Sequence, residues 1–249
     1  MPPPQGSWNR VEGPGDYPFT NEVHNDTYAA IDPTKADHVG HSGFNSGASK
    51  GLGRALALSL AKSSASEIAV GARSELTEVV AAIRQAANEA GRPEPKVLAV
   101  KLDVRDQASV EAATEKIAAD FGKLDVVINS AEIIEPVTSI VDSSPDVWWS
   151  VWEVNVRGSY LISRSCIPLL LKGKLDTLIM ISSVGAHVII PGLSAYQPGK
   201  LAITRFMEFA AAKYKDQGLV PFSVHSGNVL SDIISEDTSY FQVRRKTRS

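Results

Sequence analysis

Prediction of the fold begins at Gly47-Ala-Ser-Lys-Gly51-Leu-Gly53, which is followed at once by the strongly helical segment Arg54–Ser63 (RALALSLAKS). Glycines at this spacing let the backbone turn tightly and approach a pyrophosphate, which the first amides of the next helix can bind. Three glycines also occur in ordinary loops. The glycine spacing therefore predicts a phosphate site only if the turn lies within an alternating series of strands and helices.

Short apolar runs alternate with helical stretches along the rest of the chain. The runs are apolar on both faces, as strands buried in a parallel sheet are. They are Glu67–Val70, Val97–Val100, Val126–Ile128, Leu178–Ile181 and Leu219–Val224. Helix candidates lie between them, at about 51–63, 75–90, 107–121, 146–172 and 195–215. This alternation predicts an α/β fold with a doubly wound parallel sheet and right-handed crossovers, in a single domain.

The two ends of the chain and the first predicted strand depart from this pattern. Residues 1–40 are rich in Pro, Gly, Asn and Asp, and we expect an extended arm there. The first strand would be His41–Ser46 (HSGFNS), which lacks the apolar character of most central strands. A basic tail over 236–249 is interpreted as solvated, although its cations could also contact phosphates. The folded domain is expected over 41–235.

Composition and charge exclude several functional classes. The chain is 43% hydrophobic and 21% charged, with a formal net charge of −3, so no basic field attracts nucleic acid or an anionic membrane. Cys166 is the single cysteine, which fits a reducing compartment. The five histidines form no metal-ligand spacing, and no apolar run approaches the roughly 20 residues of a membrane span. We expect a cytoplasmic protein without a metal site, a membrane partner or a nucleic-acid partner.

The residues after the second predicted strand bear on the kind of phosphate that is bound. A site for NAD usually offers a carboxylate there, to bind the ribose 2′-hydroxyl. This chain has Gly71-Ala72-Arg73-Ser74 instead, and Lys50 adds a second cation from the glycine turn. Two cations favour a 2′-phosphate, which a guanidinium can bind bidentately, and so predict NADP(H). The alternative is that both are surface cations.

A second motif, Tyr196-Gln-Pro-Gly-Lys200, opens the last predicted helix. The i, i+4 spacing places the phenol and the ammonium on one helix face, where the ammonium favours the phenolate. Tyr196 could then act as general acid toward a carbonyl or as general base toward an alcohol. Ser183 follows the strand Leu178–Ile181, so it is expected at the ligand-binding edge of the sheet, beside the substrate oxygen.

Together these motifs resemble the short-chain dehydrogenase/reductase family, of the type with a single Rossmann domain, over about residues 38–232. The glycine turn is similar to the family's cofactor motif, with Ser46 in place of its usual threonine. Leu102-Asp103-Val104 resembles the segment whose aspartate contacts adenine. Asn155 matches the asparagine that holds a proton-relay water near the lysine. The resemblance implies four catalytic residues: Asn155, Ser183, Tyr196 and Lys200.

The resemblance also implies an activity and a cofactor site. It implies an NADP(H)-dependent oxidoreductase that moves hydride between the nicotinamide and a small carbonyl or secondary alcohol substrate. Similarity to fungal members suggests a role in secondary metabolism, and a homodimer through the long helices is a possible assembly. The implied cofactor-binding residues are Gly47, Ser49, Lys50, Gly51, Leu52, Gly53, Arg73, Asp103, Val104, Asn129, Ala131, Tyr196, Lys200, Val229 and Ser231.

Four departures from the family pattern leave an alternative open. The first strand is polar, and Glu132 replaces a glycine close to the cofactor, where a carboxylate should weaken the binding of an anion. Ser226-Gly-Asn-Val stands in place of a Pro-Gly pair, and the family's last helix and strand have no counterpart in the sequence. The alternative is therefore a truncated or degenerate homologue without catalysis, with a binding or scaffold role.

Overall fold

The structure is a computed structural model. It describes residues 28–227, together with residues 6–7, 21–22, 24, 229 and 233. The predicted tail over 236–249 and most of the predicted arm over 1–40 lie outside these residues. The described end of the arm holds two short 3-10 turns, Ala29–Ile31 and Pro33–Lys35. The arm and the tail therefore stay predictions.

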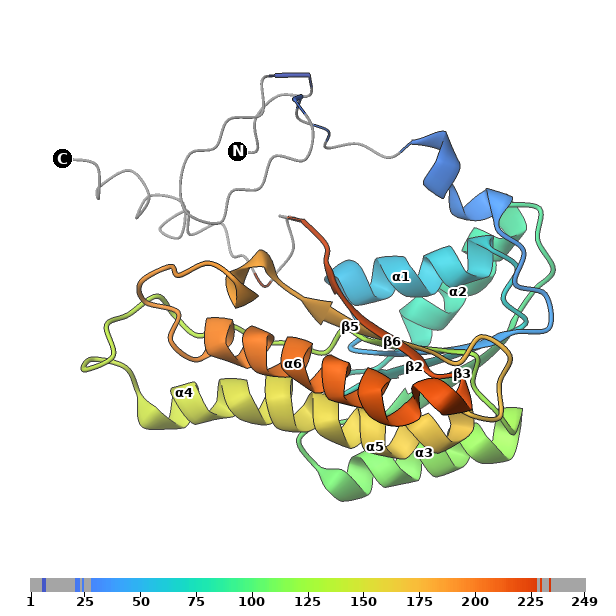
Figure 1. The fold of residues 1–249 in the computed structure, drawn as a ribbon. Helices are drawn as coiled ribbons and strands as arrows, with labels where there is room; N and C mark the ends of the chain where they lie inside the picture. The colour runs from blue at the N-terminus through green and yellow to red at the C-terminus, as the bar shows by residue number, and fades with distance from the viewer. Residues whose placement is uncertain are drawn as a thin grey trace.

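A parallel sheet of six strands in the order β3-β2-β1-β4-β5-β6 forms the centre of the described part of the chain (Figure 1). The strand order changes direction at β1, as in a doubly wound sheet, so the predicted fold class is confirmed. Each strand lies within two residues of its predicted bounds. The strands are β1 Ser42–Ser46, β2 Glu67–Ala72, β3 Lys96–Lys101, β4 Val126–Asn129, β5 Thr177–Ser182 and β6 Val220–His225.

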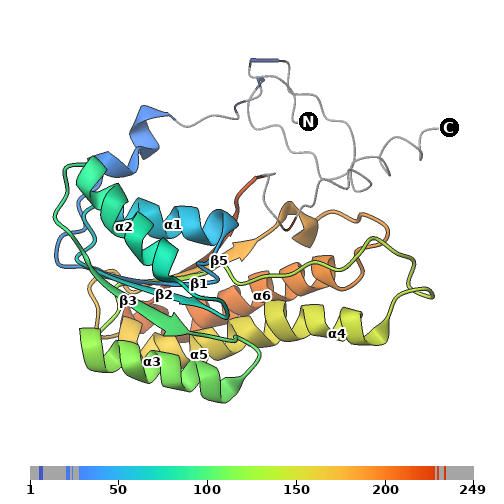
Figure 2. The same ribbon diagram turned by 180° about the vertical axis from the view of Figure 1, so that it is seen from behind.

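Helices cover both faces of the sheet (Figure 2). On one face α1, Gly51–Lys62, and α2, Thr77–Glu89, bury a smaller hydrophobic cluster that includes Ile68 and Ile83. The larger cluster, which includes Phe44 and Met180, lies on the opposite face. The helices of that face are α3 Gln107–Phe121, α4 Pro145–Trp152, α5 Ser159–Leu170 and α6 Tyr196–Tyr214. None of the described helices is long and apolar enough to cross a membrane.

The single helix predicted over 146–172 is wrong in one respect. Between α4 and α5 the chain forms a π-helical segment, Glu153–Gly158, although the backbone stays in the right-handed helical region at both of its flanks. The Ser159 hydroxyl donates to the carbonyl of Asn155 at 2.6 Å, within this widened turn. A 3.6-residue hydrophobic pattern does not distinguish such a turn from regular helix, and π turns often occur at functional sites.

Strand β1 is central and entirely buried, despite its polar sequence. Each of its polar side chains has a buried partner. Asn45 donates from Nδ2 to the carbonyl of Gly53 at 2.5 Å and accepts from the Ser130 hydroxyl at 2.9 Å. The Ser46 hydroxyl donates to Oδ1 of Asn129. A buried polar group costs stability only when it lacks a hydrogen bond, so this strand does not need an apolar sequence.

The carboxylate of Asp125, which is fully buried, joins three segments at the amino ends of the strands. Its Oδ2 accepts from the Ser42 amide at 2.8 Å and the Ser42 hydroxyl at 3.1 Å, and it forms an ion pair with Lys123. Its Oδ1 accepts from the Lys174 amide at 2.7 Å. Burial alone would raise the pKa of this carboxyl, but the hydrogen bonds and the Lys123 ammonium outweigh it and lower the pKa to about 2.

We expect Asp125→Asn to lower the free energy of unfolding at pH 7 by about 2–4 kcal/mol, because it leaves the Lys123 ammonium and buried amides poorly paired. Since the folded-state pKa lies below the unfolded value, the carboxylate stabilises the fold above about pH 4. That contribution, about 2 kcal/mol, is lost as the pH falls toward 2.

Urea denaturation between pH 7 and pH 2 measures both effects. The difference between wild type and Asp125→Asn should narrow as the solution becomes acidic. Asp120→Asn, at an exposed position on α3, is the control and should change the stability by less than about 0.5 kcal/mol. A difference that stays constant down to pH 2 would contradict the assignment.

Candidate active site

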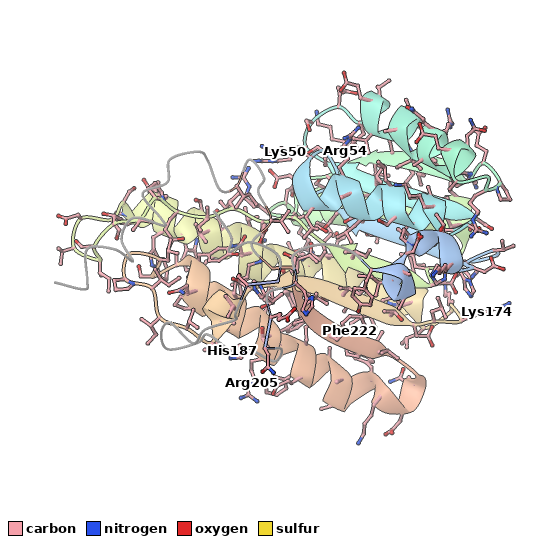
Figure 3. The ribbon with its side chains drawn as sticks, turned by 90° about the horizontal axis from the view of Figure 1, so that it is seen from above. Lys50, Arg54, Lys174, His187, Arg205 and Phe222 are labelled. Carbon is pink, nitrogen blue, oxygen red and sulfur yellow. The ribbon has the colours of Figure 1, made fainter. Side chains whose placement is uncertain are left out.

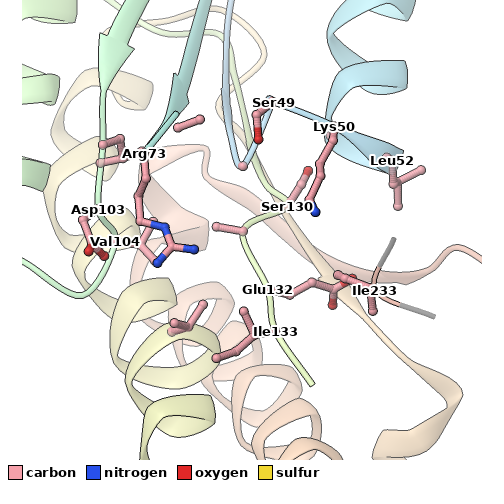
Figure 4. Close-up of a pocket in the computed structure, with 17 residues that line it drawn as sticks. Ser49, Lys50, Leu52, Arg73, Asp103, Val104, Ser130, Glu132, Ile133 and Ile233 are labelled. Carbon is pink, nitrogen blue, oxygen red and sulfur yellow. The ribbon is translucent and has the colours of Figure 1, made fainter. Parts of the chain in front are cut away.

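A pocket of about 160 Å³ lies where β1, β2, β3 and β4 end (Figure 4). The carboxyl ends of parallel strands are the usual ligand-binding edge of an open α/β sheet, and the strand order also changes direction here. The lining residues follow directly after these four strands, with contributions from α1, Val154 and Ile233. They are Gly47, Ser49, Lys50, Gly51, Leu52, Gly53, Ala72, Arg73, Leu102, Asp103, Val104, Ser130, Ala131, Glu132, Ile133, Val154 and Ile233.

The glycine turn is built from positions that exclude side chains. Gly47 has a φ of +75°, and a Cβ there would lie 2.7 Å from the backbone of Ala131. A Cβ on Gly53 would lie 2.2 Å from the carbonyl oxygen of Gly47. Because α1 begins at Gly51, its first backbone amides lie at the pocket wall. The turn thus has the form that a bound phosphate requires.

Both cations predicted for the 2′-phosphate line this pocket. Figure 4 shows the Lys50 and Arg73 side chains extending into it from opposite walls. Asp103, predicted to contact adenine, also lines the pocket, and its carboxylate forms a fork with Arg105 (Nη2–Oδ2 2.7 Å, Nε–Oδ1 3.1 Å). The hydrogen bonds from Arg105 hold the pKa of Asp103 below its usual value. The Asp103 carboxylate thus lies beside two guanidinium groups, those of Arg105 and Arg73.

The remaining predicted cofactor residues divide into three groups. Ser49, Leu52, Val104 and Ala131 line the pocket with the glycines. Asn129 does not line it: the side chain is buried below, where Nδ2 donates to the Ser159 hydroxyl at 2.8 Å and Oδ1 accepts from Ser46. Val229 is exposed and outside the pocket wall, and Ser231 lies outside the described residues.

Tyr196 and Lys200 meet on α6 as their spacing predicts. The Lys200 ammonium lies 5.3 Å from the centre of the Tyr196 ring and donates to the carbonyl of Ile181 at 2.6 Å. Lys200 is buried and Tyr196 half-buried. Ser183 follows β5 and is also half-buried, and its hydroxyl accepts from the Gly185 amide at 3.0 Å. A phenol, its neighbouring ammonium and a hydroxyl thus come from one helix start and one strand end.

Asn155 is buried in the π-helical segment and binds the backbone of the segment 132–135, which follows β4. Its Oδ1 accepts from the Ile133 amide at 3.0 Å, and its Nδ2 donates to the Ile133 carbonyl at 2.8 Å. Both ends of the side chain are therefore engaged with Ile133, and the contact seen for Asn155 is a positioning contact. The relay water that the resemblance implies stays a prediction.

Sequence reasoning missed Glu135, a buried carboxylate at the start of α6. Its Oε1 accepts from the Ala195 amide at 2.7 Å and from the Tyr196 amide at 3.0 Å. A helix start leaves its first amides without acceptors, and Ala195 has no side-chain oxygen to offer. The absence of a capping side chain at Ala195 was the one signal in the sequence. It did not indicate which distant residue supplies the acceptor.

Glu132 also reaches α6. Its Oε2 lies 2.6 Å from the Lys200 ammonium, and the two side chains are only 16% and 2% exposed. The sequence predicted a carboxylate beside the cofactor here, and the structure places this carboxylate in the pocket wall. It adds a contact that the sequence did not predict, namely an ion pair with the lysine of the Tyr196 motif.

Comparison with known proteins identifies the family. The model of the short chain dehydrogenase family matches residues 46–239. The chain is 49% identical to the short chain dehydrogenase pigC of Monascus ruber over 234 residues, which are 94% of this chain and 77% of that protein. The chain belongs to the short chain dehydrogenases.

Two further similarities support this placement. This short chain dehydrogenase is 44% identical to the short chain dehydrogenase tazN of Aspergillus terreus, over 94% of this chain but only 51% of that protein. Among solved structures, a putative short chain dehydrogenase from Escherichia coli CFT073 superposes with a TM-score of 0.64 at 26% identity. That match covers 72% of this chain and 78% of the other.

Members of the family are oxidoreductases that bind nicotinamide cofactors, and the pocket lining of this short chain dehydrogenase suits the adenosine and pyrophosphate part of such a molecule. The cradle between Gly47 and Gly53, which a Cβ would fill, suits a pyrophosphate, and the two cations suit an additional phosphate. Two carboxylates from the described part of the chain line the pocket: Asp103 is paired with Arg105, whereas Glu132 opposes an anion on the side of Lys200. In the described ranges, no group of three or more His, Cys, Asp or Glu side chains could hold a metal ion.

We expect Glu135→Ala to lower the free energy of unfolding by about 2–3 kcal/mol, because it leaves two amides at the start of α6 without their acceptor. Urea denaturation measures the loss. Glu208→Ala is the matched control, since Glu208 is an exposed glutamate on the same helix, paired with Arg205 at the surface. That change should cost less than about 1 kcal/mol, and equal losses in the two variants would contradict the capping role.

Proposed function

We propose that this short chain dehydrogenase transfers hydride between NADP(H) and a small molecule that carries a carbonyl or a secondary alcohol. The observation that carries this proposal is the arrangement at one edge of the sheet. A phosphate-sized cradle with Lys50 and Arg73 at its walls adjoins, through Glu132, the buried Lys200 beside Tyr196. A nicotinamide cofactor and a proton-transferring phenol are the two components that carbonyl reduction needs.

The proposed cofactor contacts follow from the pocket walls. The glycine turn with Ser49 and Leu52 would bind the pyrophosphate through backbone amides, and Lys50 with Arg73 would bind the 2′-phosphate. Asp103 with Val104 would hold the adenine. On the nicotinamide side the proposed contacts are Asn129, Ala131, Tyr196, Lys200, Val229 and Ser231. The pocket wall contains the residues proposed for the phosphates and the adenine, but only Ala131 of the nicotinamide side, and Asn129 is buried below it.

The protein's own groups move the proton. When bound, the nicotinamide supplies hydride to the substrate carbon, or accepts it from there in the reverse direction. As the carbonyl π electrons move onto oxygen, Tyr196 donates its phenolic proton to that oxygen, and in the reverse direction it removes the proton from the alcohol. Ser183 orients the oxygen by a hydrogen bond. Lys200 stabilises the phenolate that remains, and Asn155 supports the proton relay.

The cellular setting and the assembly belong to the same proposal. The similarity to short chain dehydrogenases of Monascus ruber and Aspergillus terreus favours a role in fungal secondary metabolism, in the cytoplasm. The net charge of −3 speaks against a nucleic-acid or membrane partner. Exposed apolar side chains on the long helices support a homodimer through these helices, because burying such side chains favours association. They are Trp149, Tyr160, Leu201 and Phe209.

Tyr196→Phe removes the proton donor and keeps the ring beside the Lys200 ammonium. We expect turnover of carbonyl substrates to fall by at least about 100-fold, since a positioned general acid contributes this much or more. The affinity for NADPH should stay within about twofold, because the hydroxyl adds little to cofactor binding. Steady-state kinetics and fluorescence titration measure the two quantities. Full activity in the variant would exclude the assigned role of Tyr196.

Arg73→Ala tests the choice of cofactor. We expect NADPH to bind about 10- to 100-fold more weakly, because a charge-assisted contact to the 2′-phosphate is lost, whereas the affinity for NADH should not change. Arg54→Ala is the control, since Arg54 lies near Lys50 at the start of α1 but outside the pocket wall (Figure 3). It removes the same charge and should change either affinity by less than about threefold.

The same titration separates an enzyme from a homologue without catalysis. Tight, NADPH-selective binding by the folded wild type is the expected result. A folded protein that binds neither NADPH nor NADH would favour the alternative of a degenerate binding or scaffold protein.

A further inference from the structure

Glu132 is the point at which the pocket meets the catalytic helix. Its side chain belongs to the pocket wall, while its Oε2 lies 2.6 Å from the Lys200 ammonium. Figure 4 shows Glu132 on the segment that leaves β4, across the pocket from Arg73. Lys200 itself is not among the lining residues and is only 2% exposed. The carboxylate therefore stands between the lysine and any molecule in the pocket.

The contacts of Lys200 define what a ligand would have to change. An ammonium has three donors. One donates to the carbonyl of Ile181 at 2.6 Å, and the Glu132 carboxylate lies at ion-pair distance, 2.6 Å from the ammonium, without an aligned hydrogen bond. A carboxylate is a stronger acceptor for an ammonium than a ribose hydroxyl is, and the low exposure of both side chains strengthens their attraction. Because Lys200 is only 2% exposed and does not line the pocket, whereas Glu132 does, a sugar hydroxyl that binds the ammonium must first move Glu132 aside.

Binding at the part of the pocket lined by the glycine turn does not require Glu132 to leave Lys200. The glycine turn, Lys50 and Arg73 follow the ends of β1 and β2. An adenosine with 5′- and 2′-phosphates could contact these groups while the Glu132–Lys200 pair stays intact. The pocket is thus divided into a half lined by Lys50 and Arg73 and a half whose cation, Lys200, lies behind its ion pair with Glu132.

We propose that Glu132 competes with the nicotinamide half of the cofactor for Lys200. Glu132 holds the Lys200 ammonium until the nicotinamide ribose displaces the carboxylate. This inference rests on the proposed function, because it assumes that NADP(H) binds here and that Lys200 contacts the nicotinamide ribose. The adenosine half then supplies most of the affinity. The nicotinamide half adds little, because its contacts to Lys200 replace an existing ion pair and its own phosphate lies near a carboxylate.

The test compares two ligands by isothermal titration calorimetry. The ligands are NADPH and adenosine 2′,5′-bisphosphate, which lacks the nicotinamide half. For the wild-type protein we expect the two affinities to agree within about threefold. Glu132→Gly should bind NADPH about tenfold more tightly or better, while its affinity for adenosine 2′,5′-bisphosphate should stay within about threefold of wild type.

Two further variants keep the result interpretable. Glu132→Gln preserves the size of the side chain and removes its charge, and should give a smaller NADPH-specific gain of about fivefold. It decides the question if circular dichroism shows that Glu132→Gly, which leaves Lys200 unpaired, does not fold. Glu75→Gln removes an exposed carboxylate two residues after Arg73 and serves as the charge control. It should show no gain that is specific to NADPH.

The outcomes separate this inference from the proposed function. Equal gains for both ligands, no gain for either, or the same gain in Glu75→Gln would overturn the competition by Glu132 and leave the cofactor assignment standing. Failure of every folded variant and of the wild type to bind either ligand would instead overturn the proposed function, and this inference with it.

Discussion

The fully buried amide of Asn45 holds together the two walls of the pocket. It donates to the carbonyl of Gly53, at the start of α1, and accepts from the hydroxyl of Ser130, at the end of β4. Gly47 packs so closely on Ala131 that the glycine turn and the β4 loop leave no room for a side chain between them. This joint fixes the glycine turn relative to the segment that follows β4. A polar residue in the central strand is thus a requirement of the site.

The segment 132–135 positions α6, the helix that carries Tyr196. Its first residue pairs with Lys200, its second is held by Asn155, and its last binds the amides at the start of α6. Glu132 and Glu135 therefore fix the helix that carries Tyr196 relative to the pocket, and Ile133 joins the segment to Asn155. The same segment carries two carboxylates with different roles. Glu135 accepts from the amides at the start of α6 and lies outside the pocket wall, whereas Glu132 lines the pocket and opposes an anionic ligand directly.

The elements that could be predicted are those whose cause is local. The glycine turn, the strand ends and the Tyr196–Lys200 pair follow from spacing alone, and the structure places each as predicted. Strand β1 looked weak because its stability comes from partners elsewhere, such as Ser130, 85 residues from Asn45. The role of Glu135 could not be predicted for the same reason, since it caps a helix that begins 60 residues away. The π-helical segment has the hydrophobic period of ordinary helix, so the pattern predicted one continuous helix there.

Asp125 and the pocket lie at opposite ends of the same sheet. Asp125 binds where β1, β4 and β5 begin, while the pocket opens where β1 to β4 end. Few side chains belong to both ends of the sheet, so a substitution at one end affects the structure at the other end only through the length of the strands. Selection or laboratory evolution can therefore treat the two rims as separate compartments. One rim can be altered to reshape recognition, and the other can be reinforced to offset the stability that such changes remove.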